Sequence, residues 1–273
     1  MRRAAAVALL AVLLSGACTG DRIPLRYGLE AGRRFEYSLS LQAEVERTLA
    51  GVTRAQDLTA RFRVVQEIVE RLDGGGARAR MSLAPVSLTV DGAAVEPGPG
   101  QEFAVQLGPD GRVVAIGEPT GRPRQELAPL GIDRLLPRLR PVLPGTDVAT
   151  GDTWSAQTKF ADAAGSFSLA TESRLSQLGI VRRLPAALVR TTYRSPVDRR
   201  ESFANAVAEV TGTDVGAQQA WFALDGFLIE ATGDSVGTYR VTFRPPEEEL
   251  GVTAVEGALV VRLHTQMRLV RTG

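Results

Sequence analysis

The 273-residue chain has one cysteine, one histidine and, among its 32 basic residues, a single lysine. Without a second cysteine, no disulfide can form within the chain. One histidine and one cysteine are too few for a zinc or copper site of ordinary ligand type. Serine–histidine–aspartate catalysis would have to use His264, the only histidine. We therefore expect no catalytic, cofactor-binding or metal-binding residue, and no enzymatic activity.

Long hydrophobic runs are also missing, apart from a short one near the amino terminus. That run extends from Ala4 to Leu14 and follows Arg2 and Arg3. It falls short of the ~20 residues that a membrane-spanning helix needs, and small residues follow it up to Ala17. This arrangement indicates a secretory signal peptide at residues 1–17. No later stretch approaches 18 apolar residues, so we expect no spanning helix in the mature protein.

The single cysteine lies directly after this signal. The sequence Leu14-Ser15-Gly16-Ala17-Cys18 resembles the lipobox of bacterial lipoproteins, although its leucine stands four places before the cysteine rather than three. The resemblance implies cleavage before Cys18 and a diacylglycerol on its sulfur. Two or three acyl chains hold a protein firmly on a membrane, since each buried methylene contributes ~0.8 kcal/mol. The alternative is an ordinary cleavage site after Ala17, with Cys18 an incidental small residue.

The expected location is the cell envelope, with the protein anchored by the lipid on Cys18. Thr19 follows the cysteine where an aspartate could stand. In a Gram-negative cell this favours the outer membrane, with the protein facing the periplasm. Residues 18–24 are then a lipidated tether.

Composition bounds the body of the protein. Removing residues 1–17 leaves 256 residues, enough for one large β domain or two smaller ones, and 44% hydrophobic residues can fill a core. The net charge of +1 offers no field to recruit nucleic acid. The membrane, and a hydrophobic small molecule or lipid, are the expected partners.

Strict alternation of apolar and polar residues marks several long segments. From Phe35 to Val45 every odd position is apolar, which places the apolar side chains on one face of a strand. Gly74-Gly75-Gly76 and Asp91-Gly92 supply turn residues between such segments. One-sided alternation joined by short turns predicts a long antiparallel sheet. The other alternating segments are Leu58–Ile68, Ala77–Leu83, Phe103–Leu107, Phe167–Leu175, Val189–Tyr193, Tyr239–Phe243 and Leu259–Leu269.

The periodicity changes between Pro123 and Leu143. Leucines and one isoleucine recur there at three- and four-residue spacings, which suits a helix whose apolar stripe rests on the sheet. Three prolines, Pro129, Pro137 and Pro141, interrupt the segment. Because proline removes an amide donor and clashes with the preceding turn, we expect one or two short helices within residues 121–146.

Two landmarks recur in the same order, which suggests an internal duplication. Gly32-Arg33-Arg34-Phe35 and Gly151-Asp152-Thr153-Trp154 each open a predicted strand, and Asp110-Gly111 and Asp225-Gly226 follow at similar distances. The predicted halves are residues 25–120 and 147–273. Chance is the alternative, because turns in β proteins favour these residues.

These segments also carry a resemblance. The Gly-x-x-Phe-x-Tyr opening at Gly32, the stretch Val148–Trp154 and the stretch Trp221–Gly226 resemble an uncharacterised bacterial lipoprotein family. More distantly, the layout is similar to the LolA, LolB and LppX group of lipid and lipoprotein carriers. That resemblance implies a curved antiparallel sheet, a half-open barrel, with helices on its concave face. It brings no ligand-contacting residue to this chain.

Other polar and aromatic residues have simple structural interpretations. We expect His264 on the solvated face of a strand, and Glu247–Glu249 in a solvated loop after two prolines. The charged segment Arg194–Glu201 is expected in a surface hairpin. Trp154 and Trp221 are expected in the core or at its rim, with ligand stacking as the alternative.

Three functions remain open. The first is a membrane-anchored binding or carrier module whose concave apolar face takes up a lipid or another hydrophobic molecule. The second is a structural or protein-interaction lipoprotein with the same sheet filled by its own side chains, and the third is an enzyme. An open apolar cavity of several hundred cubic ångströms would favour the first function, and a solid interior would favour the second.

Overall fold

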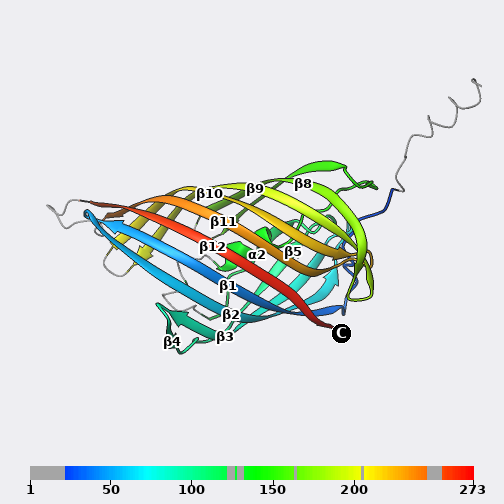
Figure 1. Ribbon diagram of the computed structural model, residues 1–273, viewed down its shortest axis with the longest axis horizontal. Coiled ribbons are helices and arrows are strands. Elements are labelled where there is room, and N and C mark those ends of the chain that lie inside the picture. The colour runs from blue at the N-terminus through cyan, green and yellow to red at the C-terminus, as the bar shows by residue number, and fades with distance from the viewer. Residues whose placement is uncertain (1–21, 122–126, 128–131, 163–164, 204–205, 245–253) are drawn as a thin grey trace, which may run out of the picture.

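The computed structural model describes residues 22–121, 127, 132–162, 165–203, 206–244 and 254–273. Within them, one antiparallel sheet curls into a nearly closed barrel around a short helix (Figure 1). This confirms the predicted mainly β, curved antiparallel fold. The elements are β1 (Arg34–Leu49), β2 (Val52–Arg71), β3 (Ala77–Val90), β4 (Ala93–Val95), β5 (Gln101–Leu107), β6 (Val113–Ile116), α2 (Ile132–Leu139), β7 (Thr153–Asp162), β8 (Gly165–Val181), β9 (Leu184–Phe203), β10 (Ala206–Ala223), β11 (Phe227–Arg244) and β12 (Val255–Thr272).

Most strands pair with their neighbours in sequence. Their order is β6-β5-β3-β2-β1-β12-β11-β10-β9-β8-β7, and the short β4 pairs with β3 beside this path. The first and last strands pair with each other, from Phe35 with Thr272 to Leu49 with Gly257. β6 and β7, at the two ends of the order, lie next to each other and form the seam of the barrel.

The alternation in the sequence becomes the inner and outer faces of this wall. On β1, Phe35, Tyr37, Leu39 and Leu41 are buried, at 5% exposure or less, while outward positions between them carry polar residues such as Glu36. Because successive side chains on a strand point to opposite faces, an 11-strand path of such segments encloses an apolar interior. No helix among the described residues is long and apolar enough to cross a membrane.

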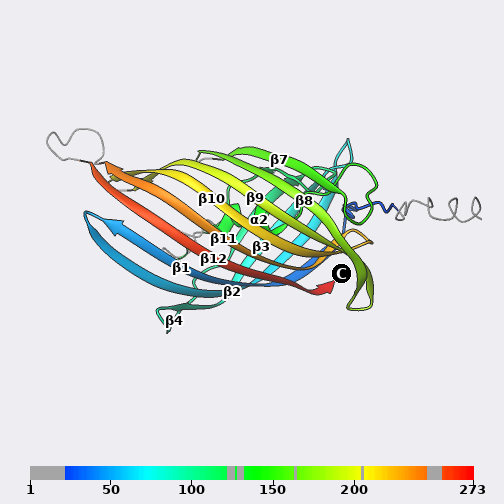
Figure 2. The ribbon, with the colours of Figure 1, turned by 45° about the horizontal axis from the view of Figure 1, so that its top comes forward.

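The chain before β1 crosses one end of the barrel, and we call residues 22–31 the N-terminal strap. Ile23 exchanges two backbone hydrogen bonds with Val148, at 2.8 and 3.0 Å, and the amide of Gly28 donates to the carbonyl of Gly226 at 2.8 Å. The β2–β3, β5–β6, β8–β9 and β10–β11 turns lie at this same end, which we call the strap end (Figure 2). The strap therefore ties the two halves of the chain together.

The predicted helical connector contains α2. Helix α2 runs from Ile132 to Leu139 and keeps Pro137 in its last turn. The structure thus confirms one short helix, and the remainder of the predicted helical stretch, at 122–126 and 128–131, lies outside the described residues. Figures 1 and 2 show α2 inside the barrel, so it fills the concave face rather than resting on an open sheet.

The turns follow the expected glycine chemistry, with one exception. Gly74, Gly75 and Gly92 have positive φ angles of 83°, 86° and 79° and lie in turns, as predicted. The charged segment 194–201, however, lies inside β9, so the prediction of a surface hairpin was wrong. Arg194, Asp198 and Arg200 are exposed on the outer face of the strand. They alternate with the inward residues Ser195, Val197 and Arg199, which are buried or half-buried.

The landmarks of the suggested duplication occupy similar local structures. Gly32 and Gly151 precede β1 and β7 with φ angles of 86° and 100°, and Gly111 and Gly226 have φ angles of 78° and 95° in their turns. Such angles favour glycine because any Cβ is strained there. The duplication and the two domain halves remain predictions, since both halves share one sheet.

Candidate functional site

The interior around α2 is the candidate site. The helix turns Leu135, Leu136 and Leu139 into the apolar wall, each at 3% exposure or less. It is also fastened by polar side chains, which is unusual inside a barrel, because a buried polar group needs a partner. Gln218 of β10 donates from Nε2 to the carbonyl oxygen of Leu139, at 2.6 Å.

An ion pair holds the last turn of α2 to β10. Arg138 of the helix donates to Asp214, whose other carboxylate oxygen accepts a hydrogen bond from the Tyr239 hydroxyl of β11. The side chains of Arg138 and Asp214 are only 10% and 4% exposed. The Arg138 guanidinium also lies 6.0 Å from the ring centre of Phe167 on β8. A charge buried to this degree is stabilised only by its partners.

Glycines in β10 and β11 make room for this cluster. A Cβ at Gly216 would lie 2.5 Å from the ring of Tyr193, and one at Gly237 would overlap the Tyr239 hydroxyl and the Asp214 carboxylate. Both glycines face inward, on the same side of the sheet as Asp214. Their missing side chains therefore allow the tyrosines and the aspartate to lie close to the wall.

The C-terminal end of α2 reaches the opposite wall. Arg140, just after the helix, donates to the side-chain oxygen of Gln66 on β2. Its guanidinium lies 4.7 Å from the ring centre of Tyr27 in the strap, which is cation–π distance. Its Nε is buried without a hydrogen-bond partner among the described residues. The helix thus bridges β10 and β2 through Arg138 and Arg140.

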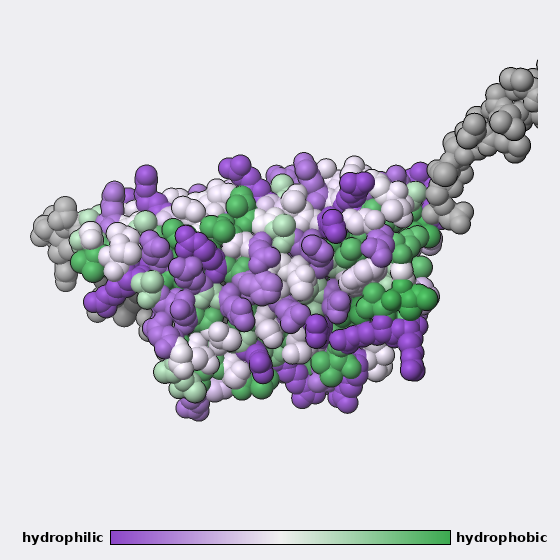
Figure 3. Space-filling model, in the orientation of Figure 1, coloured by the Kyte–Doolittle hydropathy of each residue, from purple (hydrophilic) through white to green (hydrophobic). Residues whose placement is uncertain are grey.

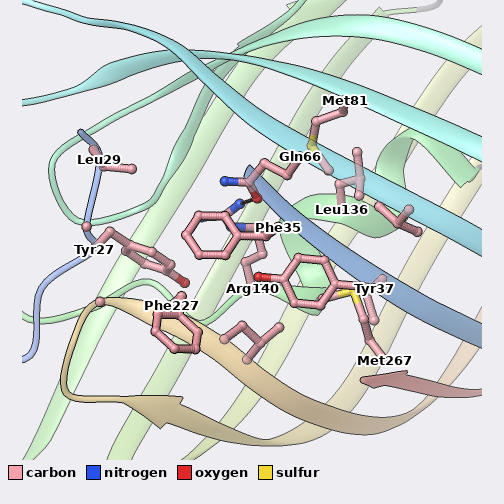
Figure 4. Close-up of a pocket in the computed structure, with 15 residues that line it drawn as sticks. Tyr27, Leu29, Phe35, Tyr37, Gln66, Met81, Leu136, Arg140, Phe227 and Met267 are labelled. Atoms are coloured by element: carbon pink, nitrogen blue, oxygen red, sulfur yellow. Dashed lines mark hydrogen bonds between the residues drawn. The ribbon is translucent and has the colours of Figure 1, made fainter. Parts of the chain in front are cut away.

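A small cavity lies between this end of α2 and the strap (Figure 4). Aromatic rings of Tyr27, Phe35, Tyr37 and Phe227 surround it, and Arg140 and Gln66 supply its polar atoms. Its volume of about 20 Å³ is room for one or two water molecules. A second space, beside Arg138 and Tyr193, measures about 10 Å³. In the described part of the chain, the interior around α2 is therefore almost filled.

The strap closes this cavity toward the strap end. Tyr27 stacks edge-on against Phe222, with ring centres 4.8 Å apart, and donates from its hydroxyl to the carbonyl of Pro141 at 2.8 Å. A Cβ at Gly111 would overlap the Tyr27 ring. The glycine of the first Asp-Gly turn is therefore a packing requirement of the strap as well as a turn residue.

Burial shifts the acidity of every tyrosine in the chain. The pKa values of Tyr27, Tyr37, Tyr193 and Tyr239 are all raised above the ordinary value of 10.0, first of all because the protein removes the phenolate from water. For Tyr239 the negative charge of Asp214 raises the pKa further. The phenols are therefore neutral hydrogen-bonding groups and not bases.

His264 lies where the sequence predicted, on the outer face of β12, with its side chain 48% exposed. Its Nδ1 is 2.7 Å from Oδ1 of Asp234 on β11, a partner that the sequence did not reveal. The pair sits in a broad open depression across β2, β1, β12, β11 and β10. Its neighbours across the strands are Gln42 and Asp234, and neither is the serine that a serine–histidine–aspartate triad requires.

One motif was missed at the sequence level. Gly233-Asp234-Ser235-Val236-Gly237 has the spacing of the nucleophile elbow found in serine hydrolases. The structure places it in the middle of β11 and not at a turn between a strand and a helix. Ser235 shares the inward face with Gly237, whereas His264 faces outward. The two side chains lie on opposite sides of the sheet, so they form no triad.

The other residues singled out in the sequence have structural surroundings. Trp154 is half-buried and donates from Nε1 to the carbonyl of Val142 at 2.7 Å, and Trp221 lies against Gly179. Asp110 and Asp225 precede the two turn glycines. Cys18 and Glu247–Glu249 lie outside the described residues. Among those that are described, no three histidine, cysteine, aspartate or glutamate residues gather as metal ligands.

Comparison with known proteins adds no assignment: neither a protein-family model nor a curated protein matches this chain.

Proposed function

We propose that this protein is a lipid-anchored, non-catalytic protein of the bacterial envelope whose barrel binds a hydrophobic molecule in the space occupied by α2. In a Gram-negative cell the anchor would lie in the outer membrane, and the barrel would face the periplasm. The proposal depends on one observation. An apolar wall surrounds a short helix that is held by three buried leucines and by polar contacts at and just after its last turn.

The size of the helix suits this exchange. An eight-residue helix is about 12 Å long and about 10 Å across, so its departure would vacate on the order of 900 Å³. Ligand pockets fall in the range of about 300–1,000 Å³. Arg138 and Asp214, and Gln218 and the Leu139 carbonyl, would exchange their contacts with each other for water. The polar side chains of β10 would lie on one side of the vacated space, and the buried apolar residues of the other strands would suit an acyl chain or similar molecule.

A second function is favoured by the small cavities. With spaces of only about 20 and 10 Å³ beside α2, the same barrel with a permanently seated helix would be a structural or protein-interaction lipoprotein. In that case its outer surface would carry the function.

Two measurements separate these functions. Native mass spectrometry of the protein purified from its own host should show a bound hydrophobic molecule if the interior takes one up. Titration with the apolar fluorophore N-phenylnaphthylamine should show about fivefold tighter binding to Gln218→Ala than to the unmodified protein. The reason is that losing one hydrogen bond of about 1 kcal/mol shifts α2 toward the displaced state.

The control is Gln219→Ala, the neighbouring position whose side chain is exposed on the outer face. It should bind the fluorophore as the unmodified protein does. If no molecule copurifies and Gln218→Ala binds no more fluorophore than Gln219→Ala, the seated-helix function stands instead.

The anchor has its own test. Replacing Cys18 with serine should move the protein from the detergent phase to the aqueous phase, and the mass of the mature amino terminus should lose its lipid. An unchanged phase and mass would refute the lipid attachment.

A further inference from the structure

The β8–β9 hairpin extends beyond the rim of the barrel at the strap end. Pairing of β7 with β8 ends at Thr153 and Arg174, and pairing of β10 with β9 ends at Ala223 and Ala186. The hairpin continues to its turn at Val181 and Leu184. Beyond these pairs no other described strand lies beside residues 176–184, and we call residues 175–185 the finger (Figure 2). Its base is bonded to Gly151, Asp152 and Leu224, and at its tip Arg182 donates to the carbonyl of Leu269 on β12.

This finger exposes large apolar side chains. Ile180 is 78% exposed and Leu178 is 39% exposed. Leu224 of the β10–β11 turn, 38% exposed, lies beside them, because its amide donates to the carbonyl of Pro185 at 3.0 Å. Figure 3 shows apolar residues gathered at this end of the molecule, near the point where the N-terminal trace leaves. Grouped apolar exposure of this kind marks an interaction site.

The tip of the finger carries two arginines in an unfavourable backbone conformation. Arg182 and Arg183 have φ angles of 51° and 68°, as a two-residue type I′ turn requires. The β1–β2 and β3–β4 turns meet the same requirement with Ala50-Gly51 and Asp91-Gly92. Glycine accepts such angles freely, and arginine does not. Arg182 has a structural contact, because it donates to the carbonyl of Leu269 on β12. Arg183 is a cation at a position where local stability favours glycine.

The base of the finger is joined to the strap. The side-chain carboxylate of Asp152 accepts a hydrogen bond from Nη2 of Arg22 at 3.0 Å. Its backbone carbonyl accepts another from the amide of Leu175, also at 3.0 Å. Arg22 is four residues after Cys18, and four extended residues span at most about 14 Å. A lipid on Cys18 would hold the strap end within that distance of the membrane.

We infer that the finger docks on the phospholipid membrane that holds the lipid of Cys18. Leu178 and Ile180 enter the boundary between headgroups and acyl chains, and Arg183 binds a lipid phosphate. Both contacts are usual for interfacial segments. The inference rests on the anchoring part of the proposed function and adds an orientation to it. The strap end faces the bilayer, and the opposite end of the barrel faces away.

The test replaces the lipid with another anchor, so that it does not depend on Cys18. Residues 19–273, which retain every described element, carry a hexahistidine tag at the amino terminus. Vesicles of phosphatidylethanolamine and phosphatidylglycerol with a nickel-chelating lipid recruit them. Without Cys18 the chain has no cysteine, so Ile180→Cys gives a single attachment point for a nitrobenzoxadiazole label. Val52→Cys, at the opposite end and 59% exposed in the native residue, is the matched control.

On recruitment, the label at position 180 should shift its emission to shorter wavelength and be quenched by spin-labelled lipid, while the label at 52 should stay unchanged. No response at 180, or equal responses at 180 and 52, would overturn the inference. Failure of lipid attachment itself would appear only in the amino-terminal mass of the native protein. The two failures are thus distinguishable.

Two further variants test the chemistry, with the label moved to position 178 (Leu178→Cys). Ile180→Ser should lower the inserted fraction about tenfold, as expected for losing one large apolar side chain. Arg183→Gly, which leaves the hydrogen bond from Arg182 to Leu269 in place, should raise the thermal stability of the barrel, because the turn strain is relieved, and yet weaken insertion into anionic vesicles. A purely structural turn would show the first effect without the second, and that result would also overturn the inference.

Discussion

Arg138 of α2 and Asp214 of β10 form an ion pair inside the barrel, with side chains 10% and 4% exposed. Tyr239 donates a hydrogen bond to the same carboxylate. Water is excluded from the pair, so each charge depends on the other for its stability. The position of α2 is therefore tied to a single aspartate on the wall.

Asp214→Ala should lower the free energy of unfolding by about 3–5 kcal/mol, because it leaves the Arg138 guanidinium buried without its counter-charge. Urea unfolding measures the effect. Glu209→Ala is the control on the same strand. It removes an exposed pair with Arg244 at 3.2 Å, and it should cost less than about 1 kcal/mol. Equal losses for the two variants would contradict the assigned role of Asp214.

The double variant Arg138→Met with Asp214→Leu should recover most of the stability lost in Asp214→Ala. Replacing both members of a buried pair with apolar residues is often neutral or stabilising. Continued destabilisation of the double variant would mean that the cluster contributes more than pairing of charges, for example through Tyr239.

Gly237→Ala should destabilise the protein by about 1–3 kcal/mol, since the new methyl overlaps the Tyr239 hydroxyl and the Asp214 carboxylate. Combining it with Tyr239→Phe removes one of the overlapping atoms. The double variant should therefore lose less stability than the sum of the two single losses, as measured by urea unfolding. Thr238→Ala, whose side chain is exposed, is the control. Simple additivity would argue against the contact.

Alternation predicted much of this wall from the sequence, and the reason is visible in β1. Its inward residues from Phe35 to Val45 are all apolar or aromatic, so the apolar side of the strand is unbroken over that stretch. β10 was not recognised, because its inward face carries Gly212, Asp214, Gly216 and Gln218. Those residues are small or polar where α2 lies against them. The strand that holds the polar partners Asp214 and Gln218 of α2 is thus one that alternation does not detect.

The polar contacts of the site were beyond sequence reasoning for a related reason. Arg138 and Asp214 are 76 residues apart, and Arg140 and Gln66 are 74 apart. Which charges meet depends on how α2 lies across the barrel. The one usable signal was the cluster of glycines and polar residues at alternate positions of β10 and β11. Such residues on a face that should be apolar indicate close approach of another element.

The four tyrosines should remain protonated in the folded protein as the pH rises past 10, because all four pKa values are raised. In the unfolded chain they would ionise near 10. Their contribution to stability is thus complete below that pH and declines above it. Phenolate absorbance in an alkaline titration should appear together with loss of the β circular dichroism signal. Phenolate that appears while the barrel is intact would contradict the burial.

Glu36 should stabilise the barrel at neutral pH and lose that effect in acid. Arg63 of β2 donates to it at 2.7 Å and Arg271 of β12 at 2.9 Å, and the hydrogen bond from Arg63 is the main reason that its pKa lies below the ordinary 4.5. A depressed carboxyl pKa gives stability above the unfolded value, and that stability is lost as the pH falls. The melting temperatures of Glu36→Gln and the unmodified protein should differ at neutral pH and converge below about pH 4.

Ser38→Ala, at the next outward position on β1, removes no charge. Any offset that it causes should be the same at both pH values. If the offset of Glu36→Gln also persists unchanged in acid, the triad of Arg63, Glu36 and Arg271 does not act through ionisation.

The last strand of the chain fills a gap in the middle of the wall, because β12 lies between β1 and β11. Before residues 255–272 arrive, no strand pairs one meander with the other: they meet only at the β6–β7 seam and through the strap, and β1 and β11 have free edges. Exposed edges of this length invite pairing with other chains. A ribosome or an export channel that delivers the protein from its amino terminus must release nearly all of it before the two meanders can be joined. Loss of the final segment would therefore affect solubility as much as shape.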